Sequence, residues 1–321
     1  MRTSLLHRPL NGPFEDPMVY IKLLRERRAL LFDAGETGAL TPRQINIISH
    51  LFITHTHIDH FIGFDRILRV VLRREKPLII YGGPGITEKV EGKLRGYTWN
   101  LIEEYPVSLI VHELDGEEHR VSEFNAKRGF EKYEIKTTRA EEVILREPDF
   151  TVKVALFDHG IPVLGFSIEE ERHLNINKVK LAERGLSIGS WLSQLKDAYR
   201  RNDNSWTIKV DKKLYSLNDL KDLVVESPGK KITYITDISP TKENIERAVS
   251  LSSEADTLYI EAYFLEQDLE RAVERNHLTA GIAGRIGREA GVRELIPLHT
   301  SPKYLSNPES VINEVMENFR H

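Results

Sequence analysis

The chain has 321 residues, of which 40% are hydrophobic and 29% are charged, and its formal net charge is -4. This balance is typical of a globular protein with a substantial core, and it excludes a fibrous or largely disordered chain. The chain contains no cysteine, which excludes disulfides and thiolate chemistry and leaves His, Asp and Glu as metal ligands.

The sequence also limits what can be expected of membrane contact, cellular location and nucleic-acid binding. No uninterrupted apolar run approaches the ~18 residues of a membrane span, so we expect no membrane contact. The first residues lack an apolar stretch of secretory length, so we expect a cytoplasmic location. The small negative net charge gives no overall basic field, so any binding of nucleic acid requires a local cluster of cations.

Apolar segments of strand length alternate with segments of helical periodicity along the chain, which predicts a layered α/β architecture. The predicted strands are, in chain order, Arg28–Phe32, His50–Thr54, Pro77–Tyr81, Thr151–Phe157, Lys231–Thr236, Thr257–Ile260 and Glu294–Leu298. The predicted helices are Phe61–Leu72, Lys242–Leu251 and Thr279–Ala290, and the last ends at Gly291 as a left-handed cap requires.

Four side chains that can bind metals lie within six residues, directly after the apolar run at 51–53. They are His55, His57, Asp59 and His60. One tetrahedral ion rarely takes four ligands so close in the chain, whereas two ions can share them. We therefore expect His55 and His57 to face one ion and the other two to face a second. A single histidine would be read as an ordinary imidazole, but this spacing favours a metal site.

Three more predicted strands end at a potential ligand. His159 follows the run VALFD, Asp237 follows ITYIT, and His299 follows ELIPL. Each signal is weak alone, but together they complete a sulfur-free donor set that suits zinc. A carboxylate has two oxygens, so Asp237 is the expected bridge between two ions. Asp33 also ends a strand, and it is either a turn residue or the acceptor that fixes the tautomer of a ligating imidazole.

These motifs resemble the metallo-β-lactamase fold and, within it, the ribonuclease Z family. The resemblance covers most of the chain through LLFDAGE, FITHTHIDHFIGF, FDHGIPVLGFSIEE and YITDI. Other branches share HxHxDH, so the choice of branch depends on HLTA at 277–280 and LHTSPKY at 298–304. The resemblance implies a single domain over residues 1–321, built as a four-layer αβ/βα sandwich with two mixed sheets.

The resemblance also implies a site with two zinc ions, or with manganese or another divalent metal. One ion would be held by His55, His57 and His159, the other by Asp59, His60 and His299, with Asp237 between them. Asp59 would orient or deprotonate the attacking water. His277 is our candidate proton donor to the leaving oxygen, because histidine titrates near working pH, and Glu261 would orient its imidazole. The alternatives are a helix N-terminal histidine and a strand-end surface acid.

Residues 171–207 form a predicted insertion that is basic at its start. The stretch Glu171–Asn202 carries seven Lys and Arg against three acids, a local net charge of +4. Composition alone allows a solvated helical hairpin or an arm that binds a polyanion. The resemblance favours an arm that grips RNA. The predicted substrate contacts are Lys178, Lys180, Arg184, Arg200, Arg201, Ser301 and Lys303, with a simple turn as the alternative for the serine.

Two segments depart from the family pattern. Residues 10–17 replace the usual Gly-Thr-Gly turn, and GLSIGSW at 185–191 stands where a Gly-Pro element is usual.

Our leading hypothesis is a zinc-dependent endoribonuclease acting at the 3′ end of tRNA precursors or another structured RNA. The alternatives are a phosphodiesterase with a smaller substrate and a non-catalytic RNA-binding relative, and the complete ligand set argues against the second. The resemblance further implies a homodimer.

Overall fold

The computed structural model describes residues 5–24, 26–102 and 104–321. The chain forms two compact units: the first comprises Met1–Glu169 and Lys230–His321, and the second is Glu170–Gly229. Among the described residues, every helix is too short or too polar to cross a membrane.

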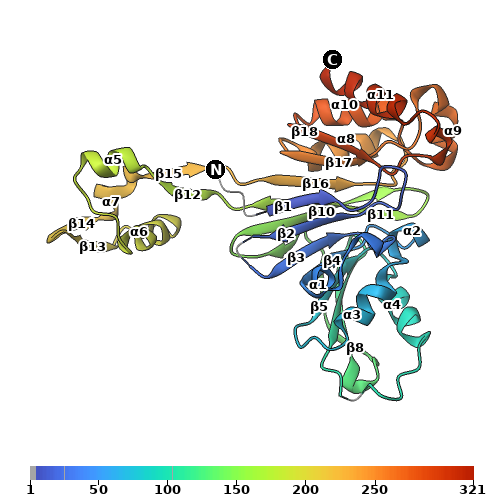
Figure 1. The fold of residues 1–321 in the computed structure, drawn as a ribbon, viewed down its shortest axis with the longest axis horizontal. Coiled ribbons are helices and arrows are strands. Elements are labelled where there is room, and N and C mark those ends of the chain that lie inside the picture. Colours follow the sequence, from blue (N-terminus) through green and yellow to red (C-terminus); the bar gives the residue numbers. More distant parts are fainter. Residues whose placement is uncertain (1–4, 25, 103) are drawn as a thin grey trace. The chain divides into compact units, whose positions relative to one another are not determined.

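The first unit contains an eight-stranded mixed sheet in which strands β1 to β8 lie in sequence order (Figure 1). The central strands β3 to β6 are parallel, and the flanking pairs are antiparallel. The strands are β1 (Leu5–Pro9), β2 (Val19–Leu23), β3 (Arg28–Phe32), β4 (Ile48–Phe52), β5 (Leu78–Gly82), β6 (Ser108–Leu114), β7 (Glu118–Asn125) and β8 (Lys132–Arg139).

A six-stranded mixed sheet completes the first unit, in the order β18-β17-β16-β11-β10-β9. Strands β16, β17 and β18 are parallel to one another, and β11 pairs antiparallel with β16. The strands are β9 (Val143–Arg146), β10 (Phe150–Asp158), β11 (Pro162–Glu170), β16 (Lys231–Ile235), β17 (Thr257–Glu261) and β18 (Glu294–Leu298).

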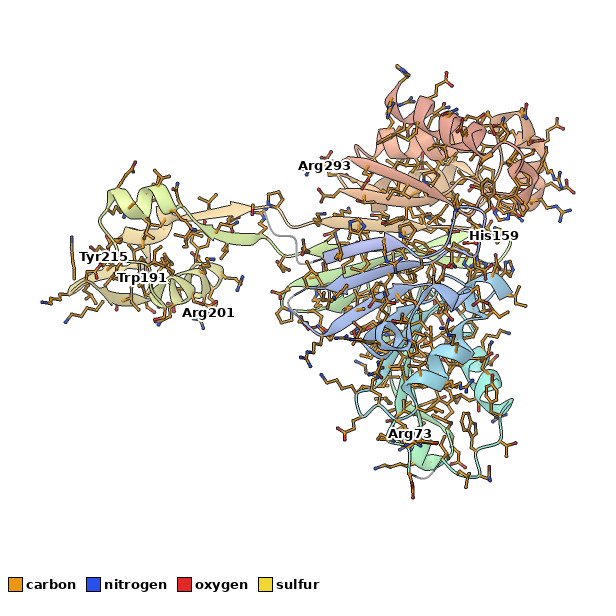
Figure 2. The ribbon with its side chains drawn as sticks, in the orientation of Figure 1. Arg73, His159, Trp191, Arg201, Tyr215 and Arg293 are labelled. Carbon is orange, nitrogen blue, oxygen red and sulfur yellow. The ribbon has the colours of Figure 1, made fainter. Side chains whose placement is uncertain are left out.

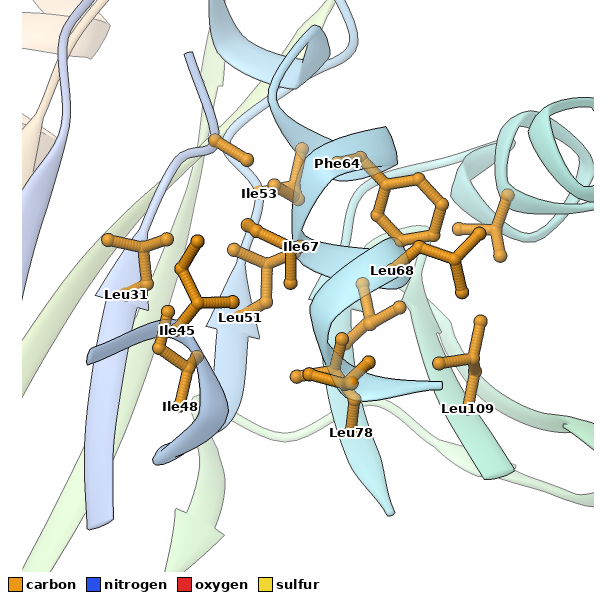
Figure 3. Packing of buried hydrophobic residues seen from close by; sticks show 14 of the residues in the cluster. Leu31, Ile45, Ile48, Leu51, Ile53, Phe64, Ile67, Leu68, Leu78 and Leu109 are labelled. Atoms are coloured by element: carbon orange, nitrogen blue, oxygen red, sulfur yellow. The ribbon is translucent and has the colours of Figure 1, made fainter. Parts of the chain in front are cut away.

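Buried side chains pack the two sheets against each other and a helical layer onto each outer face. Between the sheets, the rings of Phe32, Phe166 and Tyr234 stack at 5.7 Å. Apolar residues of α3 pack on the other face of the eight-stranded sheet (Figure 3). The second sheet is covered by α8, α10 and α11 (Figure 1). These layers are the predicted αβ/βα sandwich.

The described residues of the first unit form eight α-helices, of which α8 and α10 match the predicted helices 242–251 and 279–290 to within one residue. They are α1 (Pro42–Asn46), α2 (Ile58–Phe61), α3 (Phe64–Val71), α4 (Ile86–Arg95), α8 (Lys242–Ser252), α9 (Leu269–Arg275), α10 (Ala280–Glu289) and α11 (Pro308–Arg320). Gly291, at φ 66°, follows α10 as expected. The helix predicted at 61–72 was wrong at its start, because Gly63 lies between two separate helices, α2 and α3. A Cβ there would lie 2.1 Å from the Gly35 carbonyl oxygen, so this close approach requires glycine.

The second unit has a small core of its own. Two antiparallel strand pairs, β12 with β15 and β13 with β14, share this core with three helices. Trp191 is 8% exposed, and its indole N–H donates to the Ser187 carbonyl at 2.9 Å, so it anchors this core. The unit extends beyond the predicted 171–207, because later residues supply half of that core. Its elements are β12 (His173–Ile176), α5 (Lys178–Glu183), α6 (Trp191–Arg200), β13 (Thr207–Val210), β14 (Lys213–Ser216), α7 (Leu217–Leu220) and β15 (Val224–Ser227).

Candidate metal centre

Loops after strands of both sheets bring the candidate ligands together. The loop after β4 carries the ligands at 55–60, and His159, labelled in Figure 2, follows β10. The parallel strands β16, β17 and β18 deliver Asp237, Glu261 and His299 to one edge of the second sheet. Carboxyl ends of parallel strands meet at a common edge, which explains why residues so distant in sequence are neighbours here.

All seven sequence-predicted ligands fall into groups whose donor atoms lie within 4.8 Å of one another. The groups are His55, His57 and His159; Asp59, His60 and His299; and His55, His60 and Asp237. A fourth group joins Asp237 and His299 to Glu261 and His277. The first two groups match the predicted division between two ions, and the third connects them.

Asp237 is the point at which the groups meet. Its Oδ2 lies 3.0 Å from His60 Nε2 and 3.3 Å from His299 Nδ1, and its Oδ1 lies 3.7 Å from His159 Nε2. Asp237 and His299 both adopt left-handed backbone conformations, with φ of 53° and 52°. Such conformations cost about 1 kcal/mol or more in a non-glycine residue, and they concentrate at functional sites.

Burial and neighbouring carboxylates shift the pKa values of the imidazoles in this site in opposite directions. Burial alone would lower the pKa of His60, but the carboxylates of Asp237 and Asp33 outweigh it and raise the pKa well above the usual value. Burial is likewise outweighed at His299, where Asp237 and Asp59 raise the pKa to about 10. At His55 burial dominates and lowers the pKa to about 2. The centre therefore holds both protonated and neutral imidazoles beside buried carboxylates.

Three buried imidazole nitrogens make no well-aligned hydrogen bond within the described residues: His55 Nε2, His60 Nε2 and His299 Nδ1. The last two lie 3.0 and 3.3 Å from Asp237 Oδ2, but not in hydrogen-bond geometry. Buried polar atoms usually have a well-aligned partner. All three residues belong to the metal-type groups described above. Nitrogen and carboxylate donors without sulfur suit zinc and related divalent ions. The residues present therefore fit a divalent metal centre.

Asp33 supports the ring of His60. Its carboxylate is fully buried and lies 2.9 Å from His60 Nδ1. It also accepts hydrogen bonds from the backbone N–H and hydroxyl of Thr54 and from the hydroxyl of Tyr234, at 2.8–3.1 Å. With Nδ1–H donating to Asp33, Nε2 of His60 faces Asp237, and loss of the Nε2 proton makes its lone pair available to a metal.

Sequence reasoning missed several of these supporting residues. The carbonyl of Asn276, itself at φ 59°, accepts from His159 Nδ1 at 2.7 Å, which leaves Nε2 toward the centre. Thr54 lies 3.1 Å from His55 Nδ1, and Tyr234 reaches Asp33 from the facing sheet. The adjacency of Thr54 to the histidine motif was the only available signal, since the other two contacts join residues more than 100 positions apart.

His277 and Glu261 form a pair next to the metal-type ligands. His277 Nδ1 lies 2.8 Å from Glu261 Oε2, and Glu261 Oε1 accepts from the backbone N–H of Ile238 at 2.7 Å. Both carboxylate oxygens are therefore engaged, so Glu261 orients the histidine and is poorly placed to act as a ligand. Burial alone would raise the pKa of Glu261, but His277 outweighs it and lowers the pKa.

The predicted substrate contacts differ in their exposure and in whether their charges are already paired with nearby carboxylates. In the first unit, Lys303 Nζ lies 2.6 Å from Asp268, and Ser301 is 7% exposed. In the second unit, Arg184, Lys180 and Arg200 lie 2.5–3.7 Å from Asp222 or Asp197. Within the described residues, no carboxylate lies within 4.0 Å of the cationic groups of Lys178 and Arg201, although Arg201 interacts electrostatically with Asp203 at longer range.

Asp33→Asn should weaken metal binding about 10- to 100-fold, because the amide is a poorer partner for His60 Nδ1–H and no longer fixes the ring. Competition against a chromophoric chelator measures this. The control is Asp65→Asn, which removes a carboxylate of α3 that pairs with Lys93 of α4. An affinity for Asp33→Asn within twofold of the unchanged protein would contradict this role.

Metal binding should tighten as the pH rises from 7 to 9. In the metal-free protein His299, with its pKa raised to about 10, and His60 hold protons that a metal must displace, whereas His55 is already neutral. Each proton released makes the apparent affinity about tenfold stronger per pH unit. Titration calorimetry in buffers of different ionisation enthalpy counts the protons. An affinity independent of pH over this range would show that the imidazoles are neutral beforehand.

Comparison with known proteins shows which sequences this chain is similar to. No protein-family model matches it. The ribonuclease Z of Enterococcus faecalis is 30% identical over 319 residues, which cover 96% of this chain and 86% of that protein. The ribonuclease Z of Deinococcus radiodurans is 26% identical over 282 residues, covering 87% and 84%.

Two solved structures share the fold. The short form of human tRNase Z matches with a TM-score of 0.54 and 20% identity, over 94% of this chain and 93% of its own. A metallo-β-lactamase fold protein of Bacillus subtilis matches with a TM-score of 0.56 and 15% identity, over 98% and 92%. The fold is thus that of the metallo-β-lactamases, and with the Enterococcus match the chain belongs to the ribonuclease Z family.

Proposed function

We propose that this chain is a metal-dependent endoribonuclease that cleaves tRNA precursors at their 3′ end. The observation that carries the proposal is the convergence of seven metal-type ligands beside the His277–Glu261 pair, in a chain of the ribonuclease Z family. A phosphodiesterase restricted to small substrates is the competing function, and the activity assay below separates the two.

Two zinc ions fit the donor set best. Imidazole-rich sites favour zinc over magnesium or calcium, although manganese or another divalent metal remains an alternative. We assign His55, His57 and His159 to the first ion and Asp59, His60 and His299 to the second, with Asp237 bridging. When bound, such a pair supplies an acidified water near neutral pH and positive charge against the phosphate.

Residues of the chain would handle the two proton transfers. Burial alone would raise the pKa of Asp59, but His299 and His60 outweigh it and lower the pKa, so the carboxylate stays ionised. It is partly exposed, and it can accept a hydrogen bond from the attacking water. His277, protonated on both ring nitrogens, would give its Nε2 proton to the leaving 3′-oxygen, while Glu261 accepts from Nδ1–H and stabilises the imidazolium.

The second unit would contribute to RNA binding through its cations. Of its predicted contacts, Lys178 and Arg201 are the best candidates, because the other cations are compensated by carboxylates of the same unit. Phosphates release counterions when they meet such charges, which makes the binding depend on salt. A homodimer, supported by the family resemblance alone, and a cytoplasmic location remain part of the proposal.

The zinc-loaded protein should cleave a precursor tRNA with a 3′ extension, and His277→Ala should slow this cleavage about 100-fold or more. The same change should cost much less with bis(p-nitrophenyl) phosphate, whose aryl leaving group needs no proton. His119→Ala, which removes a half-buried histidine of β7, is the control. Hydrolysis of the aryl ester alone by the unchanged protein would favour the small-substrate alternative, and equal losses on both substrates would remove the proton-donor role.

Replacing Lys178 and Arg201 by Ser should weaken precursor binding and lower the slope of log K against log salt by about 0.7–0.9 for each phosphate that is no longer neutralised. Binding titrations at several salt concentrations measure both quantities. The control is Arg293→Ser, which removes a cation that precedes β18, at the far end of that strand from His299. An unchanged salt slope in the double variant would contradict an RNA contact at these positions.

A further inference from the structure

Tyr263 lies two residues after Glu261, in the loop that leaves β17. Its ring stacks on the imidazole of His277, with centroids 4.0 Å apart and planes inclined by only 9°. The same ring meets His299 edge-on, at 5.1 Å and 61°. Tyr263 therefore contacts both the candidate proton donor and a candidate ligand, although neither the sequence motifs nor the ligand groups include it.

The backbone that carries the tyrosine ring is itself held in place. The backbone N–H of Ser301 donates to the Tyr263 carbonyl at 3.0 Å. The preceding residue, Ala262, donates its N–H to the Leu298 carbonyl at 3.0 Å, which continues the pairing of β17 with β18. These two hydrogen bonds tie the segment that carries Tyr263 to β18 and to the loop that follows it.

The orientation of an imidazole requires two restraints. A hydrogen bond from Nδ1 to Glu261 fixes one edge of the His277 ring but leaves rotation about the Nδ1···Oε2 line. Parallel stacking removes that rotation, because tilting the imidazole would separate the two faces or press them together. On another side His159 meets the ring at 4.8 Å and 61°. Glu261 and Tyr263 together thus determine where Nε2 points.

We propose that Tyr263 is a positioning residue for His277: its stacked ring sets the imidazole plane and so aims Nε2 at the leaving 3′-oxygen. This inference rests on the proposed function. It makes a specific chemical claim, since a misplaced donor matters only when the leaving group needs a proton. Displacement of a catalytic group by about 1 Å can cost on the order of 100-fold in rate.

The test compares Tyr263→Ala, Tyr263→Leu and Tyr263→Phe on the precursor tRNA and on bis(p-nitrophenyl) phosphate. We expect the Ala and Leu variants to lose about tenfold or more in kcat on the RNA beyond any loss on the aryl ester, with little change in KM. Phe retains the stacked ring and should restore most of kcat. Tyr133→Ala, at an exposed position of β8, is the control. The Leu variant keeps apolar volume and serves if the Ala variant does not fold.

Two further readouts separate positioning from other roles. Tyr263→Ala combined with His277→Ala should be no slower than His277→Ala alone, because a positioning residue has no effect once its target is gone. The imidazole proton resonances of His277 should shift downfield in Tyr263→Ala, as the ring current of the tyrosine is removed.

Several outcomes would overturn the proposal. Equal losses on both substrates would indicate a structural role, a rise confined to KM would indicate that Tyr263 stacks on a base of the RNA, and additive losses in the double variant would show that it acts independently of His277. If the proposed function is wrong, the unchanged protein will not cleave the precursor, but the His277 resonances will still shift in Tyr263→Ala. Failure of the proposed function can therefore be told apart from failure of the positioning role.

Discussion

The parallel register of β16, β17 and β18 is the constraint on which the site depends. Ile235 pairs with Ile260, and Glu261 pairs with Leu298, so Asp237, Glu261 and His299 leave their strands at the same level. A slip of the register would move these side chains apart or turn them to the other face of the sheet. The carboxylates and imidazoles that this register brings together are almost fully buried, so each must find a partner or a metal.

Three imidazoles around the centre share one arrangement: each donates Nδ1–H to a protein acceptor and turns its other nitrogen inward. His60 donates to Asp33, His159 to the Asn276 carbonyl, and His277 to Glu261. The cost of this design is left-handed backbone at Asp33, Asp237 and His299 together with buried like charges. A divalent metal held by these residues would offset the electrostatic part of this cost.

Much of this could be predicted from sequence, for identifiable reasons. Apolar strands that end in a ligand-type residue located Asp237 and His299, and the dense spacing after β4 located His55 to His60, because strand ends and ligand chemistry are local properties. The stack of Tyr263 on His277 could not be predicted, since it depends on two loops meeting in space. The ion pair between Arg184 and Asp222 could not be predicted for the same reason. The number of Lys and Arg residues therefore overstated the number of unpaired cations in the second unit.

The central claim is that ligands from four separate loops hold two divalent ions with Asp237 between them. Anomalous diffraction from crystals of the zinc-loaded protein, recorded on both sides of the zinc edge, tests it most directly. The account predicts two peaks per chain, one beside His55, His57 and His159 and one beside Asp59, His60 and His299, with the Asp237 carboxylate in contact with both. A single peak, or peaks away from Asp237, would contradict it.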